Sequence, residues 1–348
     1  MLNEFEIRHY RGIEDLKLKD LKKVNVLAGP NNCGKTSILE AIILSGLFED
    51  VELLLDALSS RYHKFSPEFF DTLFTVGSEP VICLKSEFDS GVRNLHTHIT
   101  YRKSQVISKD AGEGIRNNFR LNFDYAYSYA VGEELHDHFV LRFEDFDNHY
   151  EVGVRRDPNN KLDSRVPCKF ISSSRFDSAE RFLQEVDKVL NQNLRQELIE
   201  ILRIFDEQII NFEIIGSKRV IKLFKEGKEP LTLYDYGNGM YKAFYIAVAA
   251  LLAKDGVLLI DEVEAGIHNK ALEYFMQKLL HVCEKSNVQL FLTTHSLEAV
   301  DVLLEDCREN LDDVAFYHIR NSEGCSAARR YSGKKLLNLR NEIGFDIR

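Results

Sequence analysis

The spacing of apolar and polar residues changes twice along this chain. Near the N-terminus, "EFEIR" (4–8) and "VNVLA" (24–28) read as strands, and "TSILEAIILSGLF" (36–48) has the spacing of a helix. Helical spacing returns over residues 51–75. From about 79 to 170, segments such as "PVICLKSEF" and "YEVGVRR" alternate like half-buried strands. We therefore predict an antiparallel, β-rich middle block.

Strand and helix patterns alternate again beyond residue 171. A helical stretch over 178–205 has Ser178 as its N-cap, and strands follow at "NFEIIG" and "RVIKLF". The later pattern predicts a helix ending at 253, the strand "VLLID" (257–261), a helix over 268–284, the strand "QLFLTT" (289–294) and an αβ tail. Such alternation around a β-rich middle predicts an α/β core with an insertion. We assign 1–50 and 171–348 to the two halves of the core and 51–170 to a helical, then β-rich inserted lobe.

Composition narrows the class of protein. The chain has 348 residues, of which 44% are hydrophobic and 29% charged, as in ordinary globular proteins. The longest apolar run, "AFYIAVAALLA" (243–253), is too short to span a bilayer and predicts a buried core helix. The N-terminus lacks the layout of a signal peptide, and the six cysteines form no C-x-x-C pair. We therefore expect a cytoplasmic protein without membrane association.

The segment "GPNNCGKT" matches G-x-x-x-x-G-K-[ST] directly after an apolar strand and before a helix. In this motif, backbone N–H groups surround a phosphate and the helix N-terminus adds positive potential. Lys35 would neutralise the β- and γ-phosphates, and the Thr36 hydroxyl would coordinate Mg²⁺. A chance glycine turn is the plain alternative. The pattern predicts that the loop binds a nucleoside triphosphate.

Three later segments fit the same chemistry. "GVLLIDEVEAG" would bring Asp261 to the Mg²⁺ and Glu262 to an attacking water, whereas the plain alternative is a buried strand ending in solvated acids. "FLTTHS" places His295 after another apolar strand, where it could sense the γ-phosphate or orient the water. "LYDYGNGMYKAF" is a glycine turn before a helix, which is either a simple cap or a second anion site.

In type and order, these motifs resemble the ABC-type ATPase heads, and more closely the OLD-like and SMC-like AAA ATPases of bacterial defence and DNA repair. The resemblance implies an α/β P-loop head with the β-rich lobe inserted after the phosphate-loop helix. It implies ATP and Mg²⁺ as ligands, Thr36 and Asp261 as metal ligands, and Glu262 and His295 as catalytic residues. The implied ATP-binding residues are Arg11 of an F-R-G-like turn, Gly29, Asn31, Asn32, Cys33, Gly34, Lys35, Thr36 and Ser37.

The resemblance also implies a signature segment, Gly237, Asn238 and Gly239, that contacts the γ-phosphate of the opposite protomer. The family's E-x-G-L-H run is matched by Glu264, Gly266, Ile267 and His268, and the tail "NEIGFDIR" resembles the family's C-terminal helix. Two features depart from the pattern. Tyr236 stands where transporter heads have serine, and the Q-loop glutamine is unassigned among Gln105, Gln192, Gln196 and Gln208. The role of "SSSR" (172–175) stays open.

Smaller signals have ordinary explanations. The pairs His96/His98 and His136/His138 would each share a face of an extended strand, but zinc needs three or four ligands. The basic segment "SKRVIKLFKEGK" (217–228) reads as a solvated hairpin, with a nucleic-acid phosphate contact as the alternative.

Three functional hypotheses follow. The first is a Mg²⁺-dependent ATPase that forms a homodimer, or a higher even-numbered homo-oligomer, head-to-tail around ATP. It would control a separately encoded nuclease or toxin in anti-phage defence, with a phage protein or DNA as trigger. The second is a non-hydrolysing, ATP-dependent scaffold or sensor. The third is a DNA-repair or recombination ATPase acting on DNA ends. Glu262 and His295 favour hydrolysis, whereas the net charge of −10 and the lack of heptads weigh against direct DNA repair.

Overall fold

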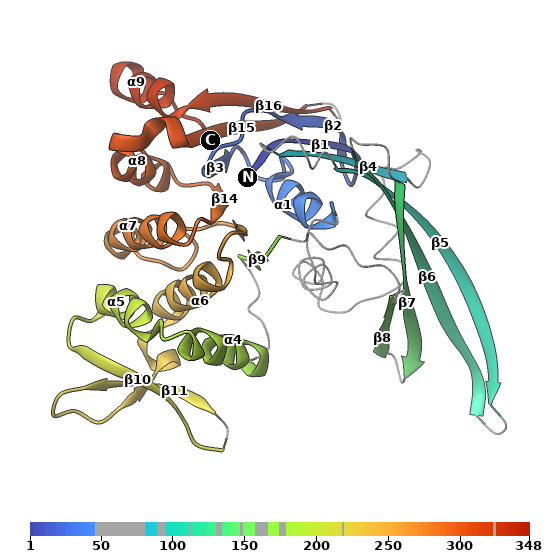
Figure 1. The fold of residues 1–348 in the computed structure, drawn as a ribbon, viewed down its shortest axis with the longest axis horizontal. Coiled ribbons are helices and arrows are strands. Elements are labelled where there is room, and N and C mark those ends of the chain that lie inside the picture. The colour runs from blue at the N-terminus through green and yellow to red at the C-terminus, as the bar shows by residue number, and fades with distance from the viewer. Residues whose placement is uncertain are drawn as a thin grey trace. The chain divides into compact units, whose positions relative to one another are not determined.

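The computed structural model describes residues 1–45, 81–88, 95–110, 113–129, 134–146, 149–156, 166–173, 179–217, 219–322 and 325–348 (Figure 1). The chain divides into two compact units. Unit 1 comprises residues 1–21, 30–165 and 317–330, and unit 2 comprises residues 22–29, 166–316 and 331–348. The division predicted from sequence, at residues 50 and 170, stays a prediction.

Unit 1 is built on a seven-stranded sheet in the order β2-β1-β4-β5-β6-β7-β8. Its strands are β1 (Leu2–Tyr10), β2 (Ile13–Leu18), β4 (Val81–Phe88), β5 (Leu95–Asp110), β6 (Glu113–Tyr129), β7 (Glu134–Phe146) and β8 (His149–Arg156). Every neighbouring pair is antiparallel. The predicted antiparallel lobe is therefore confirmed. Its sheet also includes the N-terminal hairpin, since β1 pairs with both β2 and β4.

In the described part of unit 1, the phosphate loop is followed by helix α1 (Lys35–Leu44). All of its residues except Thr36 are buried. A helix that is buried on nearly every face is stable only inside a core. Packing along the whole of α1 therefore fixes the position of its first turn, where the phosphate loop ends.

Unit 2 holds most of a six-stranded sheet in the order β16-β15-β3-β14-β13-β9. These strands are β3 (Val24–Ala28), β9 (Cys168–Ile171), β13 (Val257–Ile260), β14 (Gln289–Thr294), β15 (Val314–Ser322) and β16 (Cys325–Ser332), and the division between the units passes through the last two. β3, β14, β13 and β9 pair in parallel. β3, β13 and β14 are buried at every position, as expected for strands covered on both faces. The α/β fold class is confirmed.

Helices cover this sheet, and α6, α7 and α8 lie side by side (Figure 1). Unit 2 contains α4 (Ala179–Asn191), α5 (Arg195–Phe205), α6 (Asn238–Leu252), α7 (Asn269–Lys285), α8 (Leu297–Asp306), α9 (Gly333–Ile343) and a small sheet of β10 (Ile209–Ile215), β11 (Val220–Lys225) and β12 (Leu231–Thr232). Helix α6 is buried from Met240 to Leu251, which confirms the predicted core helix. No helix in the described part of the chain has the length and apolarity to cross a membrane.

One predicted helix is wrong in its extent. The stretch 178–205 forms two helices, α4 and α5, rather than one. Asn193 breaks it with a left-handed φ of +61°, which asparagine tolerates better than most residues. The break lets both helices pack against α6; Phe182 of α4, for example, lies with its ring centroid 4.9 Å from that of Tyr245.

Several predictions fall on residues outside the described ranges. These are the helix at 51–75, the cap Ser178 and Lys218 of the basic hairpin. The strands that carry His96, His98, His136 and His138 are described, but the surroundings of these four side chains are not. Among the side chains that are described, no group of three or more His, Cys, Asp and Glu is arranged to hold a metal.

Candidate nucleotide site

Four parallel strands of unit 2 end at one edge of its sheet. Ala28 at the end of β3 lies opposite Thr294 of β14, and Ile260 of β13 lies opposite Ile171 of β9. The residues that follow these strand ends are Gly29, His295, Asp261 and Ser172. Parallel α/β sheets bind their ligands beyond the carboxyl ends of the strands. The edge thus gathers the first residue of the phosphate loop, the predicted metal ligand Asp261 and the predicted catalytic residues Glu262 and His295. The other predicted metal ligand, Thr36, lies in unit 1.

The phosphate loop continues in unit 1 and turns into α1. Asn32 has a φ of +61° and Gly34 a φ of +98°, both in the left-handed region. Gly34 is the N-cap of α1 and has no side chain to bond the first N–H groups of the helix. A residue with a Cβ would be strained at this φ. The loop therefore presents main chain rather than side chains at the start of α1, as a phosphate-binding loop requires.

Lys35 folds back over its own loop. Its side chain is buried, and Nζ donates to the carbonyl oxygen of Pro30 at 2.7 Å and lies 3.7 Å from Sγ of Cys33. Asn31 and Asn32 are exposed, Cys33 and Ser37 are buried, and Gly34 and Thr36 lie between these extremes. The ammonium is therefore held at the loop that would surround a phosphate.

The predicted ATP contact Arg11 lies in a buried cluster with α1. Its Nε is 3.1 Å from both Oε2 of Glu40 and the hydroxyl of Tyr10, and that hydroxyl donates to the same carboxylate oxygen at 3.1 Å. Glu40 is fully buried, and a buried carboxylate requires such partners. The structure thus gives Arg11 a role in bracing the phosphate-loop helix. Its contact with ATP stays a prediction.

Asp261 is oriented by a residue of β14 and by a residue just beyond the end of β9. Oδ1 accepts from the hydroxyl of Thr293 at 2.7 Å, and Oδ2 accepts from the hydroxyl of Ser173 at 3.2 Å. Asp261 is 4% exposed. Mg²⁺ is commonly bound through one or two carboxylates plus substrate phosphates. A single buried, oriented carboxylate at a strand end fits that chemistry.

Glu262 and His295 approach each other in the same unit. Nε2 of His295 lies 3.5 Å from Oε1 of Glu262, and both side chains are partly exposed. The N–H of His295 donates to Oε1 of Glu264 at 2.7 Å. The structure therefore brings together the two predicted catalytic residues, and it assigns Glu264 a contact that the sequence did not predict.

The predicted signature forms the start of α6. Gly237 is the N-cap of the helix, and Asn238, its first residue, is exposed. Gly239 is packed much more closely, because a Cβ on it would lie 2.6 Å from the carbonyl oxygen of Gly266. Gly239 is thus needed for contact with the loop that follows Glu262 in its own chain, whatever else it contacts.

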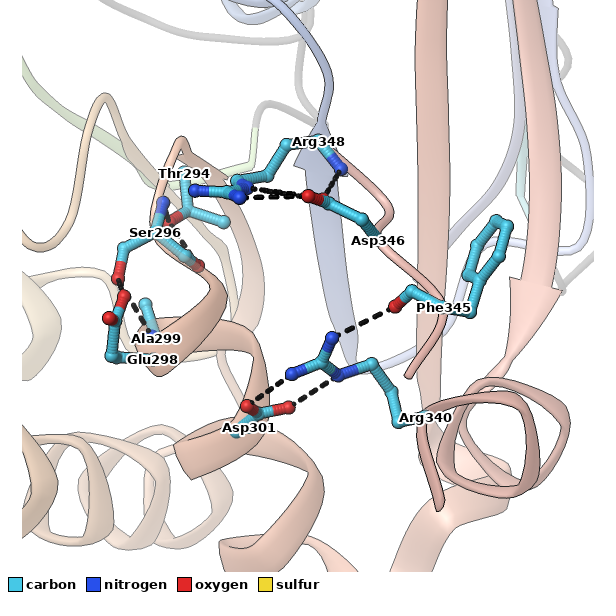
Figure 2. Close-up of polar contacts among 9 residues, drawn as sticks. All are labelled: Thr294, Ser296, Glu298, Ala299, Asp301, Arg340, Phe345, Asp346 and Arg348. Atoms are coloured by element: carbon cyan, nitrogen blue, oxygen red, sulfur yellow. Dashed lines mark hydrogen bonds and ion pairs between the residues drawn. The ribbon is translucent and has the colours of Figure 1, made fainter. Parts of the chain in front are cut away.

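Downstream of His295, helix α8 is capped and braced (Figure 2). Oγ of Ser296 accepts from the N–H of Ala299 at 3.1 Å, which caps the helix. Arg340 of α9 makes a two-pronged ion pair with Asp301 of α8, at 2.7 and 2.5 Å, and donates to the carbonyl oxygen of Phe345 at 2.9 Å. His295 is therefore joined directly to a helix that is fixed at both its cap and its side.

Comparison with known proteins agrees with a nucleotide site in this part of the chain. Residues 24–301 match a family model described as "AAA domain, putative AbiEii toxin, Type IV TA system". The chain belongs to this AAA family. An ATP/GTP phosphatase of Helicobacter pylori is 23% identical over 368 aligned positions, which cover 97% of each chain.

Two solved structures share the fold. The first is an SMC head bound to the C-winged helix domain of ScpA, with a TM-score of 0.55 and 15% identity over 96% of this chain and 99% of that one. The second is an SMC head from Pyrococcus furiosus with an extended coiled coil, bound to the C-terminal domain of ScpA. Its TM-score is 0.53, at 12% identity over 99% of each chain. At such identities the likeness shows the fold alone, which is that of an SMC-like P-loop ATPase head.

Within this AAA domain, three side chains at the site were not predicted. Ser173 and Thr293 orient Asp261, and Lys242 of α6 donates from Nζ to the carbonyl oxygen of Glu262 at 2.7 Å. Burial lowers the pKa of Lys242 to about 8, against the opposing pull of Glu264, Glu262 and Asp261. A single lysine within an otherwise apolar helix was the signal that could have identified it. The Q-loop glutamine stays unassigned.

Proposed function

We propose that this AAA protein is a Mg²⁺-dependent ATPase that dimerises around ATP and controls a separate effector. The observation that carries the proposal is the edge where Asp261, Glu262 and His295 meet at the ends of parallel strands. Family membership and the relative named as an ATP/GTP phosphatase, which matches along nearly the whole chain, support hydrolysis.

The proposed reaction gives separate roles to the residues of the phosphate loop and of the strand ends. Lys35 and the loop N–H groups bind the β- and γ-phosphates. Thr36 and Asp261 would hold Mg²⁺, which supplies charge neutralisation at the phosphates when bound. Glu262 accepts a proton from the attacking water, and His295 orients the water or the γ-phosphate. Thr293 and Ser173 keep Asp261 in place through its two oxygens.

The test of hydrolysis is ATP turnover with and without Mg²⁺. Glu262→Gln is expected to keep ATP binding and to lower turnover by about 100-fold or more, since it removes a general base. Glu284→Gln, at an exposed position of α7, is the matched control and should leave turnover unchanged. Equal turnover in Glu262→Gln and wild type would show that another carboxylate is the base.

We also propose a twofold-symmetric homodimer in which each signature contacts the ATP bound by its partner. Gly239→Asp is a poor test, because any Cβ there collides with Gly266 of the same chain. Asn238→Asp is better, since Asn238 is exposed and an acid in the first helical turn favours the helix while repelling phosphate. Asn269→Asp, at the exposed first residue of α7, makes the same substitution at another helix start as a control.

Dimerisation is measured by ultracentrifugation in the Glu262→Gln background with and without ATP. ATP-dependent association is expected in that background and in its Asn269→Asp derivative, and it should be lost in the Asn238→Asp derivative. Association that survives Asn238→Asp would contradict the signature's role in the dimer.

The proposed effector is a nuclease or toxin encoded beside this gene, and the setting is defence against phage. The family description, which names a toxin–antitoxin system, supports a paired gene product. A phage protein or DNA is the proposed trigger. The test is phage protection by the intact gene pair and by each single deletion. Protection that persists without this gene, or without its neighbour, would refute the paired defence role.

A further inference from the structure

The main chain of Glu262 is held on both sides by other residues. Its N–H donates to Oγ1 of Thr293 at 2.7 Å, and its carbonyl oxygen accepts from Nζ of Lys242 at 2.7 Å. Glu262 has a left-handed φ of +48°. For a residue with a side chain this conformation is strained and persists where surrounding contacts hold it. These two hydrogen bonds therefore determine the direction in which the Glu262 carboxylate leaves the chain.

Lys242 reaches this loop from the helix that the signature begins. It is the fifth residue of α6 (Asn238–Leu252) and is 3% exposed. A buried ammonium is costly unless acids and hydrogen-bond acceptors compensate it. Three acids act on it, namely Glu264, Glu262 and Asp261. The position of Lys242 is thus defined by the same loop whose shape it holds.

Glu264 holds the main chain of His295, as Lys242 holds that of Glu262. Oε1 accepts from the N–H of His295 at 2.7 Å. Oε2 is buried and, within the described residues, makes no hydrogen bond. Such an oxygen is destabilised unless a positive charge acts on it, and Lys242 supplies that charge. One ammonium therefore supports both the loop of Glu262 and the carboxylate that anchors His295.

A backbone contact also joins α6 to the loop that carries Glu262 and Glu264. A Cβ on Gly239 would lie 2.6 Å from the carbonyl oxygen of Gly266, so the first turn of α6 touches the loop that carries Glu262 and Glu264. A displacement at the start of α6 would therefore reach Glu262 through Lys242, and His295 through Glu264. All of these contacts lie within unit 2.

We propose that Lys242 and Glu264 are positioning residues that couple the signature to Glu262 and His295 of the same subunit. This inference rests on the proposed function, in which the signature contacts ATP held by the partner. Nucleotide in the partner's loop then sets the geometry of hydrolysis in this subunit. The two sites of a dimer consequently turn over cooperatively.

Two substitutions test the coupling. Lys242→Met keeps an unbranched chain but removes the donor, and Glu264→Gln keeps an acceptor for the His295 N–H but removes the charge. Each is expected to lower kcat by roughly 10- to 100-fold, the effect of a misplaced catalytic group. ATP affinity should be retained, and the Hill coefficient for ATP should fall to about 1. Lys278→Met, which removes a partly exposed lysine of α7 paired with Glu200 at 2.8 Å, is the control.

Hydrogen exchange without nucleotide gives a second readout that needs no turnover. In Lys242→Met, the amides of residues 261–266 and 295 are expected to exchange about tenfold faster than in the control, because the loop has lost its anchor. A wild-type protein that does not hydrolyse ATP would refute the proposed function, while the exchange rates would still judge the link from Lys242 to the loop.

The inference is overturned if both variants keep wild-type exchange, kcat and cooperativity. It is also overturned if each variant loses ATP affinity and melting temperature in proportion to its loss of turnover, which is the result of a purely structural role. If Lys242→Met does not fold, Glu264→Gln decides the question through the same measurements.

Discussion

The phosphate loop and the edge formed by Asp261, Glu262 and His295 are built by opposite means. In the loop, Lys35 bonds to Pro30, only five residues back along the chain. At the edge, Lys242 reaches Glu262 across 20 residues, Thr293 reaches Asp261 across 32, and Ser173 reaches Asp261 across 88. The loop is thus a local structure, whereas the edge exists only once several strands and α6 have come together.

This difference has a consequence for mutation. The main chain of the loop depends first on its own glycines and lysine, and the more distant contacts of Arg11 and Tyr10 act on the helix after it, through Glu40. The edge is exposed to changes in side chains that touch no nucleotide, since Thr293 and Lys242 hold the main chain of Glu262 from two separate elements. Function at the edge should therefore be lost through positioning as well as through chemistry.

The largest expected effect is in the loop. Lys35→Ala should lower ATP affinity by about 100-fold or more, because it would remove the charge-assisted bonds that we propose between Lys35 and the phosphates. Isothermal titration with ATP checks this, with Lys254→Ala, at an exposed position, as the control. Tight binding by Lys35→Ala would mean that main-chain N–H groups alone hold the phosphates.

At the edge, Thr293→Val should lower turnover by roughly tenfold with little change in ATP affinity. Its hydroxyl accepts from Glu262 and donates to Asp261, and Thr293 is fully buried. Losing both bonds in the core should also reduce the free energy of unfolding by about 1–3 kcal/mol. Turnover and urea unfolding measure the two effects. Thr293→Ser, which restores the hydroxyl, should recover turnover; failure to recover would assign the effect to packing.

A substitution at Gly239 tests the contact between the signature and the loop that follows Glu262. Gly239→Ala should reduce the free energy of unfolding by roughly 1–3 kcal/mol, because the new Cβ would collide with the carbonyl oxygen of Gly266. Asn238→Ala, one residue earlier and exposed, should stay within about 0.5 kcal/mol of wild type. Equal stability of the two variants would show that the helix start can move away from the loop.

The smallest expected effect is on pH dependence. Burial lowers the pKa of Lys242 to about 8 in the folded protein, below its ordinary value. Between the folded and unfolded pKa values the unfolded chain binds more protons, so stability rises with pH. Relative to Lys242→Met, wild type should gain about 1 kcal/mol between pH 8 and pH 9. Parallel unfolding curves for the two proteins across this range would contradict the lowered pKa.

Much of the fold was predictable from residue patterns. Mostly apolar runs predicted β3, β13 and β14, because strands covered on both faces are rich in apolar side chains. Alternation predicted the antiparallel lobe. The break between α4 and α5 was missed, because the apolar spacing continues across Asn193. Spacing alone does not reveal that a single residue adopts a left-handed φ.

The sequence by itself determined the phosphate loop, since its glycines, Lys35 and the strand and helix on either side are consecutive and act through the local backbone. It also placed Asp261, Glu262 and His295 at strand ends. Only the tertiary structure decided what holds them. Lys242, Glu264, Thr293 and Ser173 come from separate elements, and their contacts arise from strand register and the packing of α6, which spacing along the chain does not encode.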